Sequence, residues 1–362
     1  PFIIGLIADR YFNAEKILGV LHLIGAVLMY QMYTAPDISV FYPYVLSYMI
    51  LFMPTLALVN SVSFNQMRDP EKEFSTVRVW GTIGWIVAGL LISFIFHWDT
   101  VAATTEGMLK NTFLMAGVAS LILGMFSFAL PKTPPKVSTG EKIKISEILG
   151  LDALKLLKDR NFAIFFIASI LICIPLAFYY QNAHPFLSSV GMDDPTGKMT
   201  IGQISEALFL LLLPLFFKRF GFKKTILVGM LAWAVRYVLF AYGNASDLSF
   251  MLIIGIALHG VCYDFFFVSG QIYTNSKAGD RYKSAAQGLI TLATYGVGML
   301  IGFEVAGFIT DTYKTVDGGI NWQMIWIVPA GIAIVVFLLF TIFFNDKNEV
   351  KEPVLEKKYD KI

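Results

Sequence analysis

The sequence predicts an all-α polytopic membrane protein, and two observations lead to this class. Hydrophobic residues make up 56% of the 362 residues, and charged residues make up only 15%. An average soluble domain carries about 25% charged residues, so this chain has too little polar surface for a globule in water. The hydrophobic residues are also gathered into runs of about 20, the length of a helix that crosses a bilayer.

Ten complete spanning helices are predicted, because ten such runs follow one another along the chain. A membrane β-barrel is disfavoured, since its strands would be shorter segments of alternating hydrophobicity. The segment PFIIGLIADR at residues 1–10 is typical of the end of a further helix, so we expect a chain truncated at its N-terminus. The complete spans are expected at residues 14–33, 41–66, 77–96, 112–130, 161–188, 200–217, 225–243, 248–274, 285–312 and 322–344.

Lysine and arginine are concentrated on alternate connections between these spans. Connections on one side, together with the tail from residue 345, carry most of the basic residues. The opposite connections contain only Lys110, Lys198 and Lys314. Because cytoplasmic loops of membrane proteins are enriched in basic residues, we expect the basic side to be cytoplasmic.

A long polar stretch divides the chain into two helical halves. The expected parts are an N-terminal half at 1–130, a cytoplasmic linker at 131–160, a C-terminal six-helix half at 161–344 and a charged cytoplasmic tail at 345–362. Ser146 is a candidate N-cap for an amphipathic surface helix, although a solvated linker is equally compatible with the pattern.

Ionisable side chains inside the spans are the main candidates for function. Each costs roughly 2.5–3.5 kcal/mol on insertion scales, so each needs a reason to be there. Arg236 and Glu304 lie on different spans and could pair, and Arg236 is interpreted as mainly structural. No role is assigned to His22 or His97. The set is Arg78, Glu206, Arg236, Asp264 and Glu304, with histidines at 22, 184 and 259.

Two pairs of polar residues have helical spacing. Arg78 and Thr82 are four apart and share a face, suited to a sugar hydroxyl or a base carbonyl, unless Arg78 only reaches to the interface. Gln203 and Glu206 are three apart, with Ser205 beside them. A carboxylate beside an amide suits the vicinal hydroxyls of ribose, and a polar clasp between helices is the alternative.

A third group lies at residues 259–267. Asp264 is predicted to face a watery cavity, with Tyr263 beside it to stack on a planar base. His259 is either part of this site or a buried core histidine. The aromatic run Phe265–Phe267 is interpreted as lipid-facing packing more readily than as a stacking box.

A weaker candidate follows Pro175, where a helix can bend or open. Gln181 and Asn182 lie there with Tyr179 and Tyr180, either as an outer gate or as part of an interfacial aromatic belt. The two cysteines, Cys173 and Cys262, are expected to be small buried hydrophobes. Neither a metal site nor a cofactor is predicted.

At these residues the sequence resembles the nucleoside:proton symporter family of the major facilitator superfamily. The matching segments are Met53–Asn60, Arg78–Gly84, Gln203–Phe209, Phe240–Gly243 and Asp264–Gly270. The resemblance implies two six-helix halves, so the first helix and most of the second would be missing here. It also implies proton-driven uptake of purine and pyrimidine nucleosides across a bacterial inner membrane, by a monomer that binds no nucleic acid.

The resemblance implies substrate contacts from both halves. They match Arg78, Thr82, Gln203, Glu206, Tyr263 and Asp264, with His259 where bacterial members usually have tyrosine. Glu206 and Asp264 are the expected proton carriers, and Gln181 and Asn182 are aligned less well. A sugar or oligosaccharide symporter, a drug exporter, and a membrane enzyme or non-transporting nucleoside sensor are the alternatives.

Overall fold

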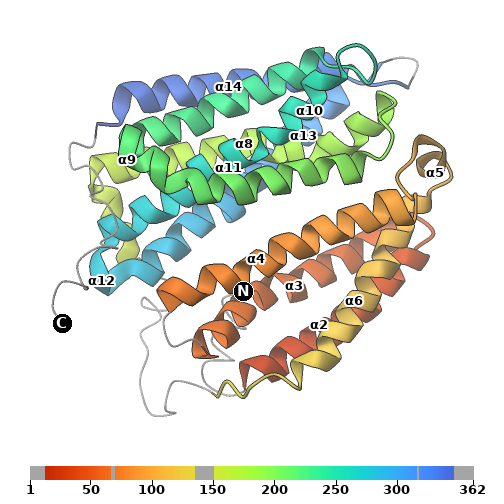
Figure 1. Cartoon of the computed structure of the whole chain (residues 1–362), viewed down its shortest axis with the longest axis horizontal. Helices are drawn as coiled ribbons and strands as arrows, with labels where there is room; N and C mark the ends of the chain where they lie inside the picture. Colours follow the sequence, from red (N-terminus) through yellow and green to blue (C-terminus); the bar gives the residue numbers. More distant parts are fainter. Residues whose placement is uncertain (1–12, 67–69, 135–150, 316–317, 346–362) are drawn as a thin grey trace. The chain divides into compact units, whose positions relative to one another are not determined.

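The computed structural model describes residues 13–66, 70–134, 151–315 and 318–345. Within these ranges the regular structure is helical, apart from one isolated bridge between Lys314 and Ile320 (Figure 1). The long helices are α2 (Ala14–Thr34), α3 (Ile38–Gln66), α4 (Pro70–Leu90), α6 (Asn111–Ser127), α8 (Arg160–Ser189), α9 (Pro195–Tyr242), α12 (Ser269–Thr291), α13 (Met299–Thr312) and α14 (Trp322–Phe343).

Shorter helical elements continue the long helices or lie between them. They are α5 (Val101–Thr105), α10 (Ser249–Ala257), α11 (His259–Tyr263), the 3₁₀ helices η2 (Met108–Lys110) and η3 (Leu151–Lys158), and the π-helices η1 (Leu91–Ile95), η4 (Asp264–Val268) and η5 (Leu292–Gly298).

The predicted membrane spans are confirmed in the described part of the chain. Nine helical stretches there are long and apolar enough to cross a bilayer, and the remaining predicted span appears as a shorter apolar helix at Val79–Ile95. Two of the nine lie on α9, which turns at Gly221 with a φ of 72°. A positive φ favours glycine, so this residue lets one continuous chain supply two spans. The predicted helix end at residues 1–8 lies outside the described residues.

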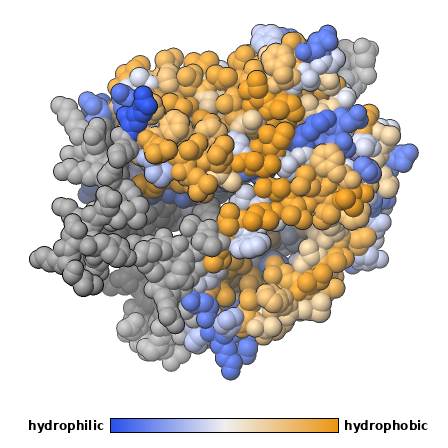
Figure 2. Space-filling model, viewed as in Figure 1, coloured by the Kyte–Doolittle hydropathy of each residue, from blue (hydrophilic) through white to orange (hydrophobic). Residues whose placement is uncertain are grey.

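Apolar side chains cover much of the described surface in the view of Figure 2. Among the described residues, Leu211, Phe308 and Ile342 are each at least 69% exposed. Exposure of so much apolar area to water is unfavourable, whereas contact of the same area with lipid chains is not. The surface therefore agrees with a protein that spans a membrane.

The chain separates into two compact units, one of Pro1–Val87 with Ile95–Lys142 and one of Ala88–Phe94 with Ile143–Ile362. In the N-terminal unit α2 packs against α3 and α6, and Figure 1 shows α2 and α6 side by side. A Cβ on Gly124 would lie 2.9 Å from Leu23, so this glycine permits the close approach of the two helices.

His22 also joins α2 to α6. Its Nδ1 atom lies 3.1 Å from Ser120 Oγ, and both residues are buried. The sequence assigned no role to His22, and the structure shows that its side chain connects two helices. Its position in the middle of α2 sets its side chain against α6.

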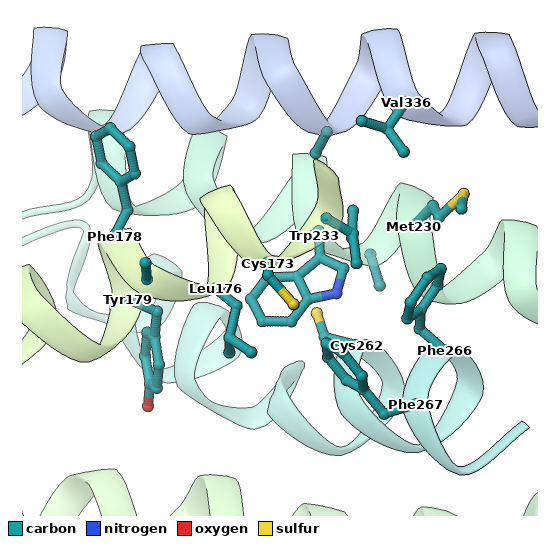
Figure 3. Close-up of a cluster of buried hydrophobic side chains, with 14 of the residues drawn as sticks. Cys173, Leu176, Phe178, Tyr179, Met230, Trp233, Cys262, Phe266, Phe267 and Val336 are labelled. Carbon is teal, nitrogen blue, oxygen red and sulfur yellow. The ribbon is translucent and has the colours of Figure 1, made fainter. Parts of the chain in front are cut away.

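The C-terminal unit has a core rich in aromatic residues, among them Phe162, Trp233, Tyr237 and Trp326. Figure 3 shows the Trp233 indole within this core, near the side chains of Cys173 and Cys262. Both cysteines are free and buried, as the sequence predicted.

The predicted linker helix is only partly described. Ser146 lies outside the described residues, and Leu151–Lys158 forms a 3₁₀ helix within the segment where an amphipathic helix or a solvated linker was expected. Its Leu156 and Leu157 pack against the core of the C-terminal unit. This packing gives two apolar side chains of the described part of the linker a place against protein.

Candidate functional site

The predicted site residues lie on both units. Arg78 and Thr82 are one helical turn apart on α4, in the N-terminal unit. The side chain of Arg78 lies outside what the structure describes, and Thr82 is partly buried. The other candidates, Gln181, Asn182, Gln203, Glu206, His259, Tyr263 and Asp264, belong to the C-terminal unit and lie on α8, α9, α11 and η4.

Two glycines bring α9 and α11 into backbone contact. A Cβ on Gly260 would lie 2.5 Å from the carbonyl atoms of Ser205, and a Cβ on Gly202 would lie 3.1 Å from His259 Cβ. Ser205 also donates its hydroxyl to the backbone carbonyl of Ala257. This close crossing places Glu206 of α9 beside His259 of α11.

His259 lies between an acid and a base. Its Nε2 atom is 3.8 Å from Glu206 Oε2, and its Nδ1 atom is 3.1 Å from Arg236 Nη1. The imidazole also stacks on the Tyr179 ring, with centroids 5.4 Å apart. His259 is only 4% exposed, whereas the Glu206 side chain keeps 27% of its surface accessible. The histidine is thus enclosed, and the carboxylate is the part of this group that a ligand can reach.

Arg236 contributes to this group from inside the protein. Its residue exposure is 0%, and its guanidinium carbon lies 3.5 Å from the centre of the Tyr179 ring. The predicted pairing of Arg236 with Glu304 is wrong, because Glu304 is exposed on α13 whereas Arg236 is enclosed against His259. The sequence had no signal for the Arg236–His259 contact, since the residues lie on different helices.

Asp264 lies at the point where the helix widens. It opens the π-helix η4 and is 1% exposed. π-helical turns inside α-helices often occur at functional sites, since they change which face the following residues present. Here Phe265, Phe266 and Phe267 all point into protein packing and are at most 7% exposed. The interpretation of these phenylalanines as lipid-facing was therefore wrong.

Tyr263 reaches a residue that sequence reasoning missed. Its hydroxyl lies 2.5 Å from the hydroxyl of Tyr295, which belongs to the π-helix η5. Tyr295 is 52% exposed. A single tyrosine in an apolar span carries no pattern that would have identified it.

The candidates near Pro175 divide into two groups. Asn182 is buried and accepts a hydrogen bond of 3.3 Å from Thr310 of α13, so it joins two helices. Gln181 is partly buried. Tyr179 is 3% exposed and lies on Arg236, which is incompatible with a place in an interfacial belt. Tyr180 is 47% exposed.

Metal chemistry has no support in the part of the chain that the structure describes. No group of three or more His, Cys, Asp or Glu side chains could hold a metal ion there. In the C-terminal unit a carboxylate, an imidazole and a guanidinium instead lie beside tyrosines. The polar groups can hydrogen-bond hydroxyls, and the tyrosine rings can stack on a planar ring.

Comparison with solved structures defines the class of protein. The crystal structure of the nucleoside transporter NupG matches with a TM-score of 0.78, over 95% of this chain and 86% of that chain, at 28% identity. A bacterial homologue of the lysosomal transporter Spinster matches in fold with a TM-score of 0.70 at 12% identity. The chain is thus a polytopic membrane protein with a major facilitator-like fold.

Sequence comparison then defines the family. Residues 1–349 match the nucleoside H⁺ symporter family, and the chain belongs to this family. It is 44% identical to YegT of Escherichia coli strain K12, named as a candidate nucleoside transporter, over 97% of this chain and 83% of that protein. It is 33% identical to the xanthosine permease of the same strain, over 96% of this chain and 84% of that protein. The family's activity is proton-coupled nucleoside transport, so the predicted class of transporter, not enzyme, is confirmed.

Proposed function

We propose that this chain carries nucleosides together with protons into a bacterial cell by alternating access, with Glu206 as the central polar contact. The observation that carries this proposal is the accessible Glu206 carboxylate beside the enclosed His259, inside a membrane-spanning unit. A carboxylate accepts hydrogen bonds from both hydroxyls of a ribose, and it also binds a proton. One side chain can therefore serve the nucleoside and the proton.

The remaining contacts are assigned around Glu206. Gln203 lies one turn earlier on α9, and Tyr263 presents an aromatic ring and a hydroxyl. In the proposed cycle Asp264 is the second candidate proton carrier, and Arg78 and Thr82 supply contacts from the N-terminal half. Rocking of two halves about a midplane site would expose the nucleoside to each side in turn.

Orientation and assembly complete the proposal. The basic connections, the linker and the C-terminal tail are placed on the cytoplasmic side, because positive residues favour that side. The carrier is proposed to work as a monomer. A sugar or oligosaccharide symporter remains the alternative cargo class, and a nucleoside sensor is the alternative from another class.

Uptake of labelled uridine by proteoliposomes tests the proposal. The wild-type protein is expected to accumulate uridine when an inward proton gradient is applied, and excess nucleoside, not excess sugar, is expected to compete. In counterflow, where no gradient is needed, the protein is expected to exchange uridine. A purified protein that binds uridine and never moves it would favour the sensor.

Neutral variants test the acids. Glu206→Gln removes a charged acceptor, a loss of about 1.5–3 kcal/mol, which is roughly a 10- to 100-fold rise in the uridine KM. The double variant Glu206→Gln, Asp264→Asn is expected to abolish gradient-driven accumulation. Glu304→Gln is the matched control, since this acid is exposed on α13. Accumulation at the wild-type level in the double variant would refute the assigned roles.

A further inference from the structure

We propose that Arg236 is a positioning residue for the nucleoside site. Arg236 holds His259 in the neutral form, with the imidazole proton on Nε2, the nitrogen nearer to Glu206. This proposal deepens the function proposed above and rests on it for its transport readout. Its structural readout, the protonation of one imidazole, is independent of transport.

The contact between Arg236 and His259 determines which imidazole nitrogen carries the proton. Arg236 Nη1 lies 3.1 Å from His259 Nδ1. A guanidinium has only donors, so Nδ1 must accept and therefore carries no hydrogen. The hydrogen of the neutral imidazole is then on Nε2, the nitrogen 3.8 Å from Glu206 Oε2. The arginine thus selects the tautomer that directs an N–H towards the carboxylate.

The distance between His259 and Glu206 fits a guiding role. At 3.8 Å His259 Nε2 and Glu206 Oε2 are within ion-pair distance and beyond the range of a hydrogen bond. Glu206 is also the more accessible partner, with 27% of its side-chain surface exposed against 5% for His259. The carboxylate can therefore be oriented from behind while its exposed side remains available for the hydroxyls of a nucleoside.

The surroundings of Arg236 favour this role over a purely structural one. Tyr179 covers one face of the guanidinium at 3.5 Å, and Trp233 and Phe240 lie at 5.6 Å. Within the described residues, Nε and Nη2 have no hydrogen-bond partner. Burying an arginine with one hydrogen-bonded nitrogen costs more free energy than burying an apolar residue of similar size, so packing alone does not explain this arginine. A specific task for that nitrogen accounts for the charge.

Charged and titratable groups surround His259 on neighbouring elements and on its own helix, α11, which also carries the buried thiol of Cys262. Arg236 and Glu206 approach from α9, Tyr179 stacks from α8, and Tyr263 lies one turn along α11 with its ring centroid 5.8 Å away. Asp264 follows directly at the start of η4. Of these groups, Arg236 is the one that donates to Nδ1.

Nitrogen-15 NMR of the histidine-labelled protein in lipid bilayers tests the tautomer directly. The chain has four histidines, so His259→Gln assigns the signals of His259 by their loss. The wild-type protein is expected to show a bare Nδ1 and a protonated Nε2 at pH 7. In Arg236→Met the donor is gone, so both tautomers are expected, whereas Arg236→Lys keeps a cationic donor and the wild-type spectrum. A protonated Nδ1 in the wild-type protein overturns the proposal, even if Arg236→Met does not fold.

Uridine transport tests whether the tautomer matters for function. Arg236→Met is expected to raise the KM roughly tenfold, the equivalent of about 1.4 kcal/mol, with a smaller change in kcat. In a His259→Phe background the same substitution is expected to change the KM less than twofold, since its effect passes through the imidazole. Arg219→Met, which removes an exposed arginine at the end of a span, is the matched control and is expected to behave as wild type.

The outcomes separate this proposal from the proposed function. Independent, multiplicative effects of Arg236→Met and His259→Phe on the KM would assign Arg236 a structural role only and overturn the proposal. A wild-type protein that moves no nucleoside would refute the proposed function, while the NMR result would still decide the role of Arg236.

Discussion

A single buried hydroxyl decides which ring nitrogen of His22 carries a proton. Ser120 Oγ donates to the backbone carbonyl of His22 at 3.0 Å, and the same oxygen lies 3.1 Å from His22 Nδ1. A hydroxyl has one hydrogen, so it must accept from Nδ1–H while it donates to the carbonyl. His22 and His259 thus hold opposite tautomers, and each is set by one neighbouring side chain.

Loss of the Ser120 hydroxyl should destabilise the N-terminal unit. Ser120→Ala leaves the buried Nδ1–H of His22 without its acceptor, which costs about 1–3 kcal/mol. We expect a lower melting temperature in detergent and unchanged uridine transport. Ser127→Ala is the control, because Ser127 Oγ donates only to Leu123 of its own helix, at 2.7 Å. An equal loss of stability in both variants would contradict this account of His22.

At the scale of helices, the turn at Gly221 brings a lysine to the end of α14. Lys223 Nζ donates to the carbonyls of Thr341 and Phe344 at 3.0 Å and 2.6 Å. The last carbonyls of a helix have no partner within the helix, and a cation is favoured beside them. Lys223, which the sequence identified only as part of a basic loop, therefore caps the C-terminal end of α14, a helix distant in the chain.

Removal of this lysine should loosen the end of α14 alone. Lys223→Met takes away both hydrogen bonds, and the expected cost of roughly 0.3–1 kcal/mol corresponds to about two- to fivefold faster hydrogen exchange at residues 341–344. Lys224→Met is the matched control, since the side chain of Lys224 is next in the sequence and is exposed. Faster exchange there in both variants, or in neither, would show that Lys223 does not cap α14.

At the scale of the whole molecule, the distribution of charge determines how the chain lies in the membrane. The first span of α9 runs between the connection that contains Asp193 and the basic turn that contains Lys224. Both residues are exposed, whereas the native thiols, Cys173 and Cys262, are 0% exposed. Introduced cysteines at these two positions would therefore be the accessible thiols in the described part of the chain.

Labelling of intact cells tests the orientation. A membrane-impermeant maleimide is expected to modify Asp193→Cys in intact cells and Lys224→Cys only after the cells are permeabilised, because basic connections stay in the cytoplasm. Permeabilised cells, in which both variants react, provide the control for accessibility. Modification of Lys224→Cys in intact cells would reverse the proposed orientation.

The spans and the family could be predicted because they depend on local properties of the chain. A bilayer requires about 20 apolar residues and internally satisfied backbone groups, so apolar runs predict helices. The same cost of burial singled out Glu206 and Asp264 as polar residues that need a reason to lie in lipid. The phenylalanines after Asp264 were misread because an apolar side chain in a span is equally suited to lipid and to protein packing, so hydrophobicity alone does not distinguish the two.

By itself, then, the sequence determined the class of protein, the helical spans and which acidic residues lie inside them, since hydropathy and periodicity are properties of a single segment. Only the tertiary structure decided which polar groups meet. Arg236 lies on the second span of α9, 23 residues from His259, whereas the crossing at Gly202 and Gly260 brings the first span of α9, with Glu206, beside the same histidine. Such contacts depend on how side chains of separate helices pack, and the periodicity of one helix does not identify the residues of the helix that packs against it.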